Sequence, residues 1–483
     1  MVMRSGWAVL MAFGAVVATG QAEAQTQAQS NIHTLQQALA AAYANNPVLQ
    51  AERANLRATD ERVPAALAGW RPQVLLTGSA GIGAGKTNSF GTTAANPLFG
   101  ITGGKTKNSA TEDRGETAAS LTVTQPIYRG GKTKAATHQA ENTVMATRAQ
   151  LIATEQTVFT NSVSAYVNVI STEQVLALDI NNEQVLSKQL QATNDRFRVG
   201  EITRTDVAQA EASLASARAT RETAQGQVQT ARATYEQLIG ELPGKLLEPQ
   251  PLKLPAATEQ AARTLAVTNN PNVVSALYNE AAARDNFDLA YSSLMPNLSL
   301  QASAFRNENQ QQTGILTEGG SVIATLSVPL YQGGNEYAAI RQARQQEQQA
   351  RKQVDDARRT AVQQAVSSFQ TYVAAKATIA SNRAAIASNQ VALEGTQREA
   401  IVGSRTTLDV LNAEQLLLNS RVTLVQSLAN YVIASYNVAG AVGRLTARDL
   451  GLSVPYYDEK AYYTAVHDRW VGTGDFATDQ PGR

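Results

Sequence analysis

The sequence of 483 residues contains no cysteine and only three histidines. Without cysteine the chain can form neither a disulfide nor a thiolate metal site. His33, His138 and His467 lie far apart in the sequence and do not have the spacing of zinc ligands. No nucleophile stands in a recognisable pattern with a general base. We therefore expect neither an enzyme nor a protein that holds a metal or another cofactor.

The chain also lacks an excess of charge and a long hydrophobic run. Its 41 basic and 40 acidic residues give a net charge of +1, whereas a nucleic-acid partner would require a clustered basic face. Beyond residue 24 no apolar run reaches the eighteen or so residues of a transmembrane helix. Short segments of alternating polarity, which form membrane β-barrels, are a weaker signal and must be sought separately.

The first 24 residues have the pattern of a secretory signal peptide. Arg4 supplies the positive charge, residues 7–18 form a short apolar core, and Ala22-Glu23-Ala24 offers a cleavage site. We expect the mature chain to begin at Gln25.

The rest of the chain consists of two copies of one unit, which we place at residues 25–257 and 258–448 and which leave residues 449–483 as a C-terminal tail. Asn45-Asn46-Pro47 returns 224 positions later, and two further motifs return after 203 positions: Gln125-Pro126…Gly130-Gly131 as Val328-Pro329…Gly333-Gly334, and Val199-Gly200 as Val402-Gly403. The change of offset falls between Pro72 and Pro126, where the first copy has a longer loop rich in Gly, Thr and Asn. Such an insertion is typical of a surface hairpin.

Each copy predicts the same order of elements. An Ala-rich helix, residues 34–68 or 259–293, precedes two short segments with apolar and hydroxyl side chains in alternation, near residues 73–82 and 119–125 or 298–304 and 321–328. This alternation suits the wall of a membrane barrel. Four strands cannot close a barrel, because the smallest have about eight. Several chains must therefore pool their strands, or the segments are soluble hairpins.

Long helices follow each double glycine, at residues 132–198 and 336–401. Apolar pairs recur every seven residues along the first, at Val144/Met145, Leu151/Ile152 and Val158/Phe159, and along the returning helix of the second copy. A seven-residue repeat predicts left-handed coiled-coil packing. Glycine after the helix end and the patterns Thr203-x-x-Asp206 and Thr406-x-x-Asp409 predict a tight turn and a capped return helix in each copy.

These motifs, found twice in the same order, resemble the TolC-like outer membrane efflux protein family. The resemblance extends from Asn45 through Gly443. It implies a mainly α fold with a β-barrel portion: a long helical coiled-coil barrel and four strands per chain, which close a twelve-stranded transmembrane barrel in a homotrimer. It implies a passive export duct that lies in outer-membrane lipid and extends into the periplasm of a Gram-negative bacterium. Its partners would be a periplasmic adaptor and an inner-membrane transporter of the ABC, RND or MFS type, and its cargo small molecules, secreted proteins or both.

The resemblance also implies a gate at the periplasmic tips. Arg405 would reach Thr205 and Asp206 of a neighbouring chain, and Asp409 would line the constriction. The adaptor would contact Val199, Gly200, Val402 and Gly403. Two departures from the family pattern, Ala400 in place of a tyrosine and Asn412 in place of a second acidic ring, predict a looser latch and weaker cation selectivity.

Several alternatives stay open at the level of sequence. Asp206 and Asp409 can be plain helix caps, and Arg405 an ordinary surface charge. Residues 80–87 loosely match a phosphate-binding loop, but no helical pattern follows them, so an extracellular strand end or loop explains their glycines better. A trimeric adhesive coiled coil and a periplasmic adaptor are the rival classes of protein. The tail can pack around the middle of the tunnel or stay partly disordered.

Overall fold

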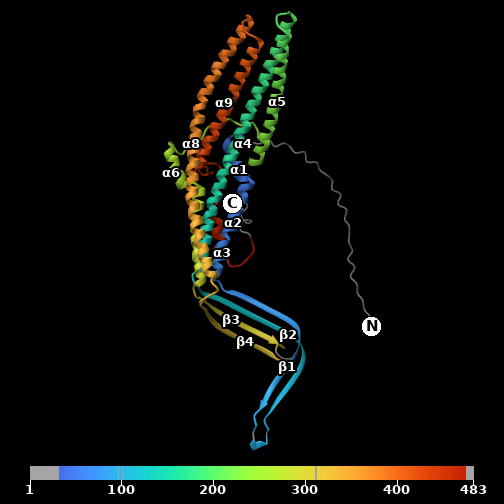
Figure 1. Cartoon of the computed structure of the whole chain (residues 1–483), viewed down its shortest axis with the longest axis vertical. Helices are drawn as coiled ribbons and strands as arrows, with labels where there is room; N and C mark the ends of the chain where they lie inside the picture. Colours follow the sequence, from blue (N-terminus) through green and yellow to red (C-terminus); the bar gives the residue numbers. More distant parts are fainter. Residues whose placement is uncertain (1–31, 96, 101, 311–312, 475–483) are drawn as a thin grey trace, which may run out of the picture.

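The computed structural model of this chain describes residues 32–95, 97–100, 102–310 and 313–474. The signal peptide expected in residues 1–24 lies outside the described residues. The molecule is elongated, with a bundle of long helices at one end and a β-sheet at the other (Figure 1). Within the described ranges, no helix combines the length and the hydropathy needed to cross a membrane.

Two antiparallel pairs of long helices form the coiled-coil end. They are α4 (Lys132–Arg198) with α5 (Arg204–Ile239), and α8 (Asn335–Ile401) with α9 (Thr407–Ala441). Both α4 and α8 have 67 residues, which corresponds to about 100 Å at about 1.5 Å per residue. Each begins directly after a glycine in the left-handed region, Gly131 or Gly334. The heptad residues Val144, Leu151 and Val158 are buried, which confirms the predicted packing.

The shorter helices correct one expectation. Residues 34–68 and 259–293 do not form continuous helices, since each breaks at the Asn-Pro pair. The helices of the first segment are α1 (Leu35–Asn45), α2 (Pro47–Asp60) and α3 (Arg62–Leu67). Those of the second are α6 (Glu259–Asn269) and α7 (Pro271–Tyr291). Proline disfavours the helical conformation of the residue before it. Asn46 and Asn270 are accordingly extended and cap the next helix with their side chains.

The four strands form one antiparallel sheet in the order β1-β2-β3-β4. Their bounds are Gln73–Thr93, Gly104–Arg129, Asn297–Glu308 and Leu316–Ser327. The expected strands were too short in the first copy, and the segment read as a loop after residue 82 is the outer half of β1. Its backbone pairs with β2 without a break as far as Thr93 and Gly104. A two-stranded ladder of this kind satisfies backbone hydrogen bonds without a hydrophobic core, so glycine and threonine can occupy it.

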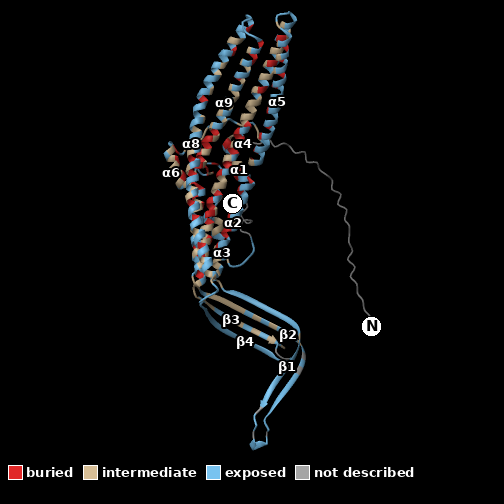
Figure 2. Ribbon diagram, in the orientation of Figure 1, coloured by how far each residue is buried: buried red, intermediate tan, exposed pale blue. Residues whose placement is uncertain are grey.

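The two faces of the sheet differ as the alternation predicted. Val74 is paired with Val123, and Leu76 with Leu121, on one face. On the other face the hydroxyl groups of Thr77 and Ser120 lie 2.6 Å apart, and those of Ser303 and Ser321 3.0 Å apart. In the single chain the sheet is largely exposed on both sides (Figure 2).

The main hydrophobic core lies in the middle of the molecule, where the short helices and the tail cover α4. Phe159, Tyr166 and Tyr235 are fully buried there. The described part of the tail packs against this region: the backbone N–H of Tyr457 donates to the hydroxyl of Tyr43 at 3.0 Å. Four short helices complete the fold, namely η1 (Ala68–Trp70), η2 (Pro97–Phe99), η3 (Ser292–Leu294) and α10 (Ala461–Val466).

Candidate functional site at the helix tips

The first tip joins α4 to α5 through the five residues 199–203. Gly200 has φ +79°, and a Cβ built there would meet no atom within 4 Å, so the glycine is needed for its backbone conformation alone. Thr203 caps α5: its hydroxyl accepts from the backbone N–H of Asp206 at 3.3 Å, and the Asp206 carboxylate accepts from the N–H of Thr203 at 3.0 Å. The predicted capping box is confirmed.

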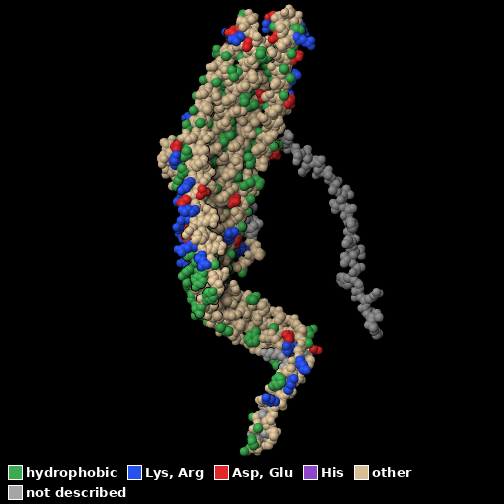
Figure 3. Space-filling view, viewed as in Figure 1, with side chains coloured by type: hydrophobic (Ala, Val, Ile, Leu, Met, Phe, Trp, Pro, Cys, Tyr) green, Lys and Arg blue, Asp and Glu red, His purple; other side chains and the backbone are tan. Residues whose placement is uncertain are grey.

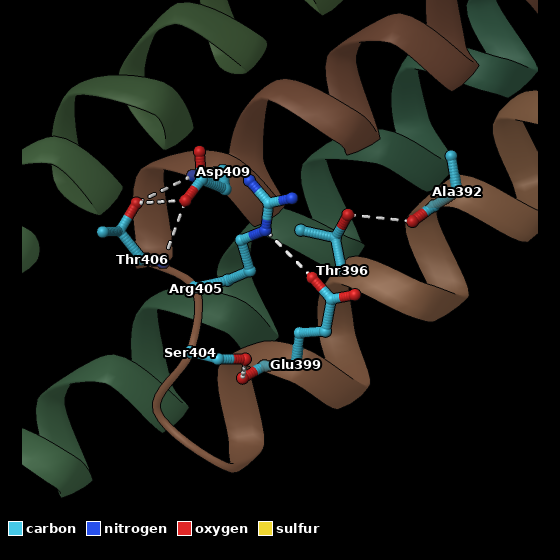
Figure 4. A network of polar contacts seen from close by, with 7 residues as sticks. All are labelled: Ala392, Thr396, Glu399, Ser404, Arg405, Thr406 and Asp409. Atoms are coloured by element: carbon cyan, nitrogen blue, oxygen red, sulfur yellow. Dashed lines mark hydrogen bonds and ion pairs between the residues drawn. The ribbon is translucent and has the colours of Figure 1, made fainter.

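The second tip repeats this geometry between α8 and α9. Gly403 also has φ +79° and open space around it. The carboxylate of Asp409 accepts from the N–H of Thr406 at 3.0 Å and from its hydroxyl at 2.8 Å. Figure 4 shows this box beside Arg405.

The two capping aspartates carry negative charge at the positive ends of their helices. The hydroxyl and the N–H of Thr203 donate to Asp206 and lower its pKa below the ordinary 3.8. The N–H and the hydroxyl of Thr406 lower the pKa of Asp409 in the same way. Both carboxylates are therefore ionised throughout the neutral range, which an acidic ring would require.

Arg405 is paired within its own turn. Its Nε donates to Oε2 of Glu399, in the last turn of α8, at 2.9 Å, and both side chains are about half exposed. The terminal Nη groups have no hydrogen-bond partner among the residues that the structure describes. Glu399 therefore orients the guanidinium and leaves its outer nitrogens for another group (Figure 4).

The first tip also holds an ion pair, with the arginine on the long helix and the glutamate in the turn, the reverse of the second tip. This pair was not predicted from the sequence. Nη2 of Arg196, in the last turn of α4, lies 2.6 Å from Oε1 of Glu201. Arg196 and Glu399 occupy matching positions, 203 residues apart, with opposite charge. A comparison of the two copies would have revealed the reversed charge at this position, but not the partner of either residue.

The remaining residues of the predicted site lie at or below the tips. Val199 and Val402 are 77% and 78% exposed. Thr205 is exposed on the first turn of α5, and Asn412 is exposed on the second turn of α9. Within the described part of one chain, no hydrogen bond or ion pair joins Arg405 to Thr205 or Asp206.

Ala400, by contrast, is buried. It packs with Leu393, Val410 and Leu417 between α8 and α9. An alanine at this position completes the apolar packing between α8 and α9, and it has no polar group with which to form a latch.

Below the tips, polar contacts join α8 to α9 at seven-residue intervals. Nδ2 of Asn389 donates to the hydroxyl of Ser420 at 2.7 Å, and Nδ2 of Asn382 donates to Ser427 at the same distance. Nearer the tip Gln397 donates to Glu414 at 3.1 Å, and burial raises the pKa of Glu414. The matching stretch of the first copy packs through Leu186, Leu214 and Ala217. At these positions the second copy has polar contacts where the first has apolar packing, whereas ion pairs to Glu183 and Glu173 join α5 to α4 elsewhere along the first pair.

Comparison with known proteins identifies the family of this chain. The model of the family described as "Outer membrane efflux protein" matches residues 35–241 and 263–444. The chain belongs to this family. It is therefore a passive outer-membrane channel protein that extends into the periplasm of a Gram-negative bacterium, and it is not an enzyme.

Individual relatives span nearly the whole chain. The outer membrane efflux protein BepC of Brucella suis biovar 1 (strain 1330) is 36% identical over 91% of this chain and 91% of its own length. The outer membrane protein TolC of Escherichia coli (strain K12) is 28% identical over 87% of this chain and 84% of its own. The solved structure of CusC superposes with a TM-score of 0.70 at 18% identity, covering 85% of this chain and 92% of that one.

Proposed function

We propose that three copies of this chain assemble into an export duct whose walls are pooled from all three. The sheet carries the proposal: it has four strands, and its outer strands β1 and β4 have free edges in the single chain. Exposed edges of this length are normally covered, and a membrane barrel requires about eight strands or more. Three copies supply twelve strands, and the apolar face formed by Val74, Leu76 and their cross-strand partners would meet lipid.

The duct would conduct cargo that other proteins select and energise. A periplasmic adaptor and an inner-membrane transporter of the ABC, RND or MFS type would provide these functions, and the cargo would be small molecules, proteins of type I secretion or both. The names of the relatives BepC and TolC support efflux and an outer-membrane location. The exposed turns at Val199-Gly200 and Val402-Gly403 are apolar, project at the far end of the coiled coils (Figure 1) and suit contact with the adaptor.

The same tips would form the gate. In the trimer Arg405 would bond to Thr205 and Asp206 of the neighbouring chain through its free Nη groups, while Glu399 holds Nε. Three copies of Asp409 would line the constriction, and Asn412 would leave it with one acidic ring. With the uncharged Ala400 and Asn412, this gate would be looser than one with a full set of polar latches.

Single-channel recording on the purified trimer in planar bilayers tests the gate. Arg405→Ser should raise the closed-state conductance, since the bonds to the neighbouring chain are lost. Arg198→Ser is the matched control, because it removes an exposed arginine that pairs with Asp195 at the other tip and leaves the proposed latch intact. Equal closed-state conductance of Arg405→Ser and the unchanged protein would exclude the latch role of Arg405.

A further inference from the structure

The outer half of the first hairpin extends beyond the sheet as a free ribbon. β2 pairs with β3 only from Thr117 onward, whereas β1 and β2 stay paired with each other from Gly81 and Glu116 to Thr93 and Gly104. These thirteen pairs correspond to about 43 Å at about 3.3 Å per residue. An isolated two-stranded hairpin is marginally stable in water, so a partner at this ribbon would stabilise it.

One face of the ribbon continues the apolar face of the sheet and then becomes basic. Along β1 this face carries Val74, Leu76, Ala80 and Ile82, and further out Lys86 and Phe90. Paired residues share a face. Lys107 lies opposite Phe90, and Lys105 lies opposite Thr92, so all three lysines of the ribbon are on the face whose inner part is apolar.

The lysines Lys86, Lys105 and Lys107 form a cationic ribbon face. Residues 78–111 contain no Asp or Glu, and no ion pair to these lysines is found among the described residues. Nζ of Lys107 lies 5.8 Å from the ring centroid of the exposed Phe90. Asp113, which lies opposite Ala84, is the first acid on this face toward the sheet. Figure 3 shows basic side chains spaced along the ribbon.

The position of the lysines along the membrane normal indicates their partner. The helices extend into the periplasm, so the ribbon lies on the cell-surface side. From Val74 to Ile82 the apolar face covers about 26 Å along the strand at about 3.3 Å per residue. For a strand tilted by about 40° this is about 20 Å along the membrane normal, comparable with the apolar band of about 25 Å in outer-membrane barrels. Lys86 is four residues further out. Lys107 and Lys105, opposite Phe90 and Thr92, are eight and ten positions beyond Ile82, which corresponds to about 26 Å and about 33 Å along the strand at about 3.3 Å per residue. Lys86 therefore falls in the headgroup layer of the outer leaflet, and Lys107 and Lys105 lie farther out beside the sugars, where anionic groups would attract them.

We propose that the cationic ribbon face binds the phosphate groups of the glycolipid of the outer leaflet, lipopolysaccharide. The site goes beyond the export function and rests only on the sheet spanning the outer membrane. Lys86 contacts the phosphates nearest the acyl chains, and Lys107 and Lys105 contact phosphates farther out. Phe90 lies among the sugars beside Lys107, and binding holds the ribbon beside the mouth of the duct.

Binding of defined lipids to the purified full-length protein in detergent tests the proposal. The probes are Kdo2-lipid A with its phosphates, the same lipid after phosphatase treatment, and phosphatidylglycerol. The test variant carries Lys86→Gln, Lys105→Gln and Lys107→Gln. The control carries Lys188→Gln, Lys245→Gln and Lys253→Gln, which remove the same charge from exposed sites on the periplasmic part.

The triple variant should bind Kdo2-lipid A about tenfold more weakly than the control, because it loses three lysines that attract anionic lipid groups. The dephosphorylated lipid should bind equally weakly to both variants, and phosphatidylglycerol, with one phosphate per molecule, should lose less affinity than Kdo2-lipid A. Equal affinity of the two variants for Kdo2-lipid A would overturn the proposal, and so would a loss of phosphatidylglycerol binding as large as that of Kdo2-lipid A.

A neighbouring copy is the other possible occupant of this face. Because the chain has no cysteine, Asn88→Cys places a single thiol on the same face as Lys86. Oxidative cross-linking of this variant into dimers in the membrane would show that the ribbons cover one another and would overturn lipid binding. Conductance of the same preparations tests the duct independently, so the two proposals can fail separately.

Discussion

Replacing Gly443 by alanine tests how the return helix of the second copy meets the Asn-Pro break between α6 and α7. Gly443 has φ +76°, and a Cβ built on it would lie 2.3 Å from the carbonyl oxygen of Asn269 and 2.7 Å from its carbonyl carbon. Backbone atoms cannot rotate away as a side chain can. Gly240, at the matching position of the first copy, has φ +91°, but its Cβ would lie 3.5 Å from Cβ of Asn45, which is ordinary contact.

The two substitutions should therefore differ in magnitude. Each forces alanine into a left-handed conformation, which costs about 1 kcal/mol. Gly443→Ala must also displace Asn269, with a packing cost of about 1–3 kcal/mol. The shift would strain the hydrogen bond from Asn270 Nδ2 to the carbonyl of Ala441, 3.1 Å long and buried, whose loss costs a further ~1 kcal/mol or more. We expect a loss of about 1 kcal/mol for Gly240→Ala and about 3–5 kcal/mol for Gly443→Ala.

Guanidinium unfolding of the purified protein in detergent, followed by the helical circular dichroism signal, measures the difference. The midpoint of Gly443→Ala should fall well below that of Gly240→Ala. Equal midpoints for the two variants would refute the close approach of the two backbones and with it the asymmetry between the two copies at this junction.

Three further predictions concern titratable groups. The caps of α5 and α9 should weaken on acidification, because the folded pKa values of Asp206 and Asp409 lie below 3.8. The stabilisation that the two carboxylates give to their helices is present above about pH 4 and is lost as the pH falls through the folded pKa. Hydrogen exchange of the first turns, corrected for intrinsic rates, should show faster opening at pH 3 than at pH 5, and no change would contradict the caps. Burial raises the pKa of Tyr166 to about 12, and its hydroxyl donates to the carbonyl of Leu247 at 2.7 Å. The free energy of unfolding should therefore fall between pH 10 and 12. Tyr166→Phe should cost about 1 kcal/mol near neutral pH and should remove this fall. Desolvation raises the pKa of the buried Asp60 to about 7, so the unchanged protein should lose stability as the pH rises from 4 to 7. In denaturation curves recorded across this range, Asp60→Asn should depend less on pH than the unchanged protein. The same dependence on pH in the two proteins would exclude the effect.

The long elements were predictable from the sequence because their signals are local and repeated. Gly131 and Gly200 enclose a stretch without proline in which apolar pairs recur every seven residues from Val144 to Tyr166, and α4 fills nearly all of the stretch between the two glycines. The hairpin faces were predictable for the same reason, since alternation with period two persists through Val74 and Leu76. Asn46 misled the expectation of a continuous helix, although the proline after it carries the information needed to place the break.

The rest depends on contacts between distant parts of the chain. Arg71 donates to the carbonyl of Arg469, 398 positions away, at 2.7 Å, and no local pattern in the tail announces this docking of residues 449–474. The partner of Arg405 was likewise missed, because Glu399 near the C-terminal end of a helix opposes the helix dipole and reads as an ordinary surface charge until the turn brings the two side chains together. At the ribbon, glycine and threonine suit a loop as well as an exposed strand, and only the register with β2 decides between them.

The central claim is that three chains form one conducting duct, and native mass spectrometry of the outer-membrane protein in detergent, combined with planar-bilayer recording of the same sample, tests it most directly. The account predicts a single species of three chains that inserts with uniform conductance steps and dissociates to single chains, with loss of conductance, on heating in SDS. A monodisperse single chain, or a trimer that never conducts, would contradict it.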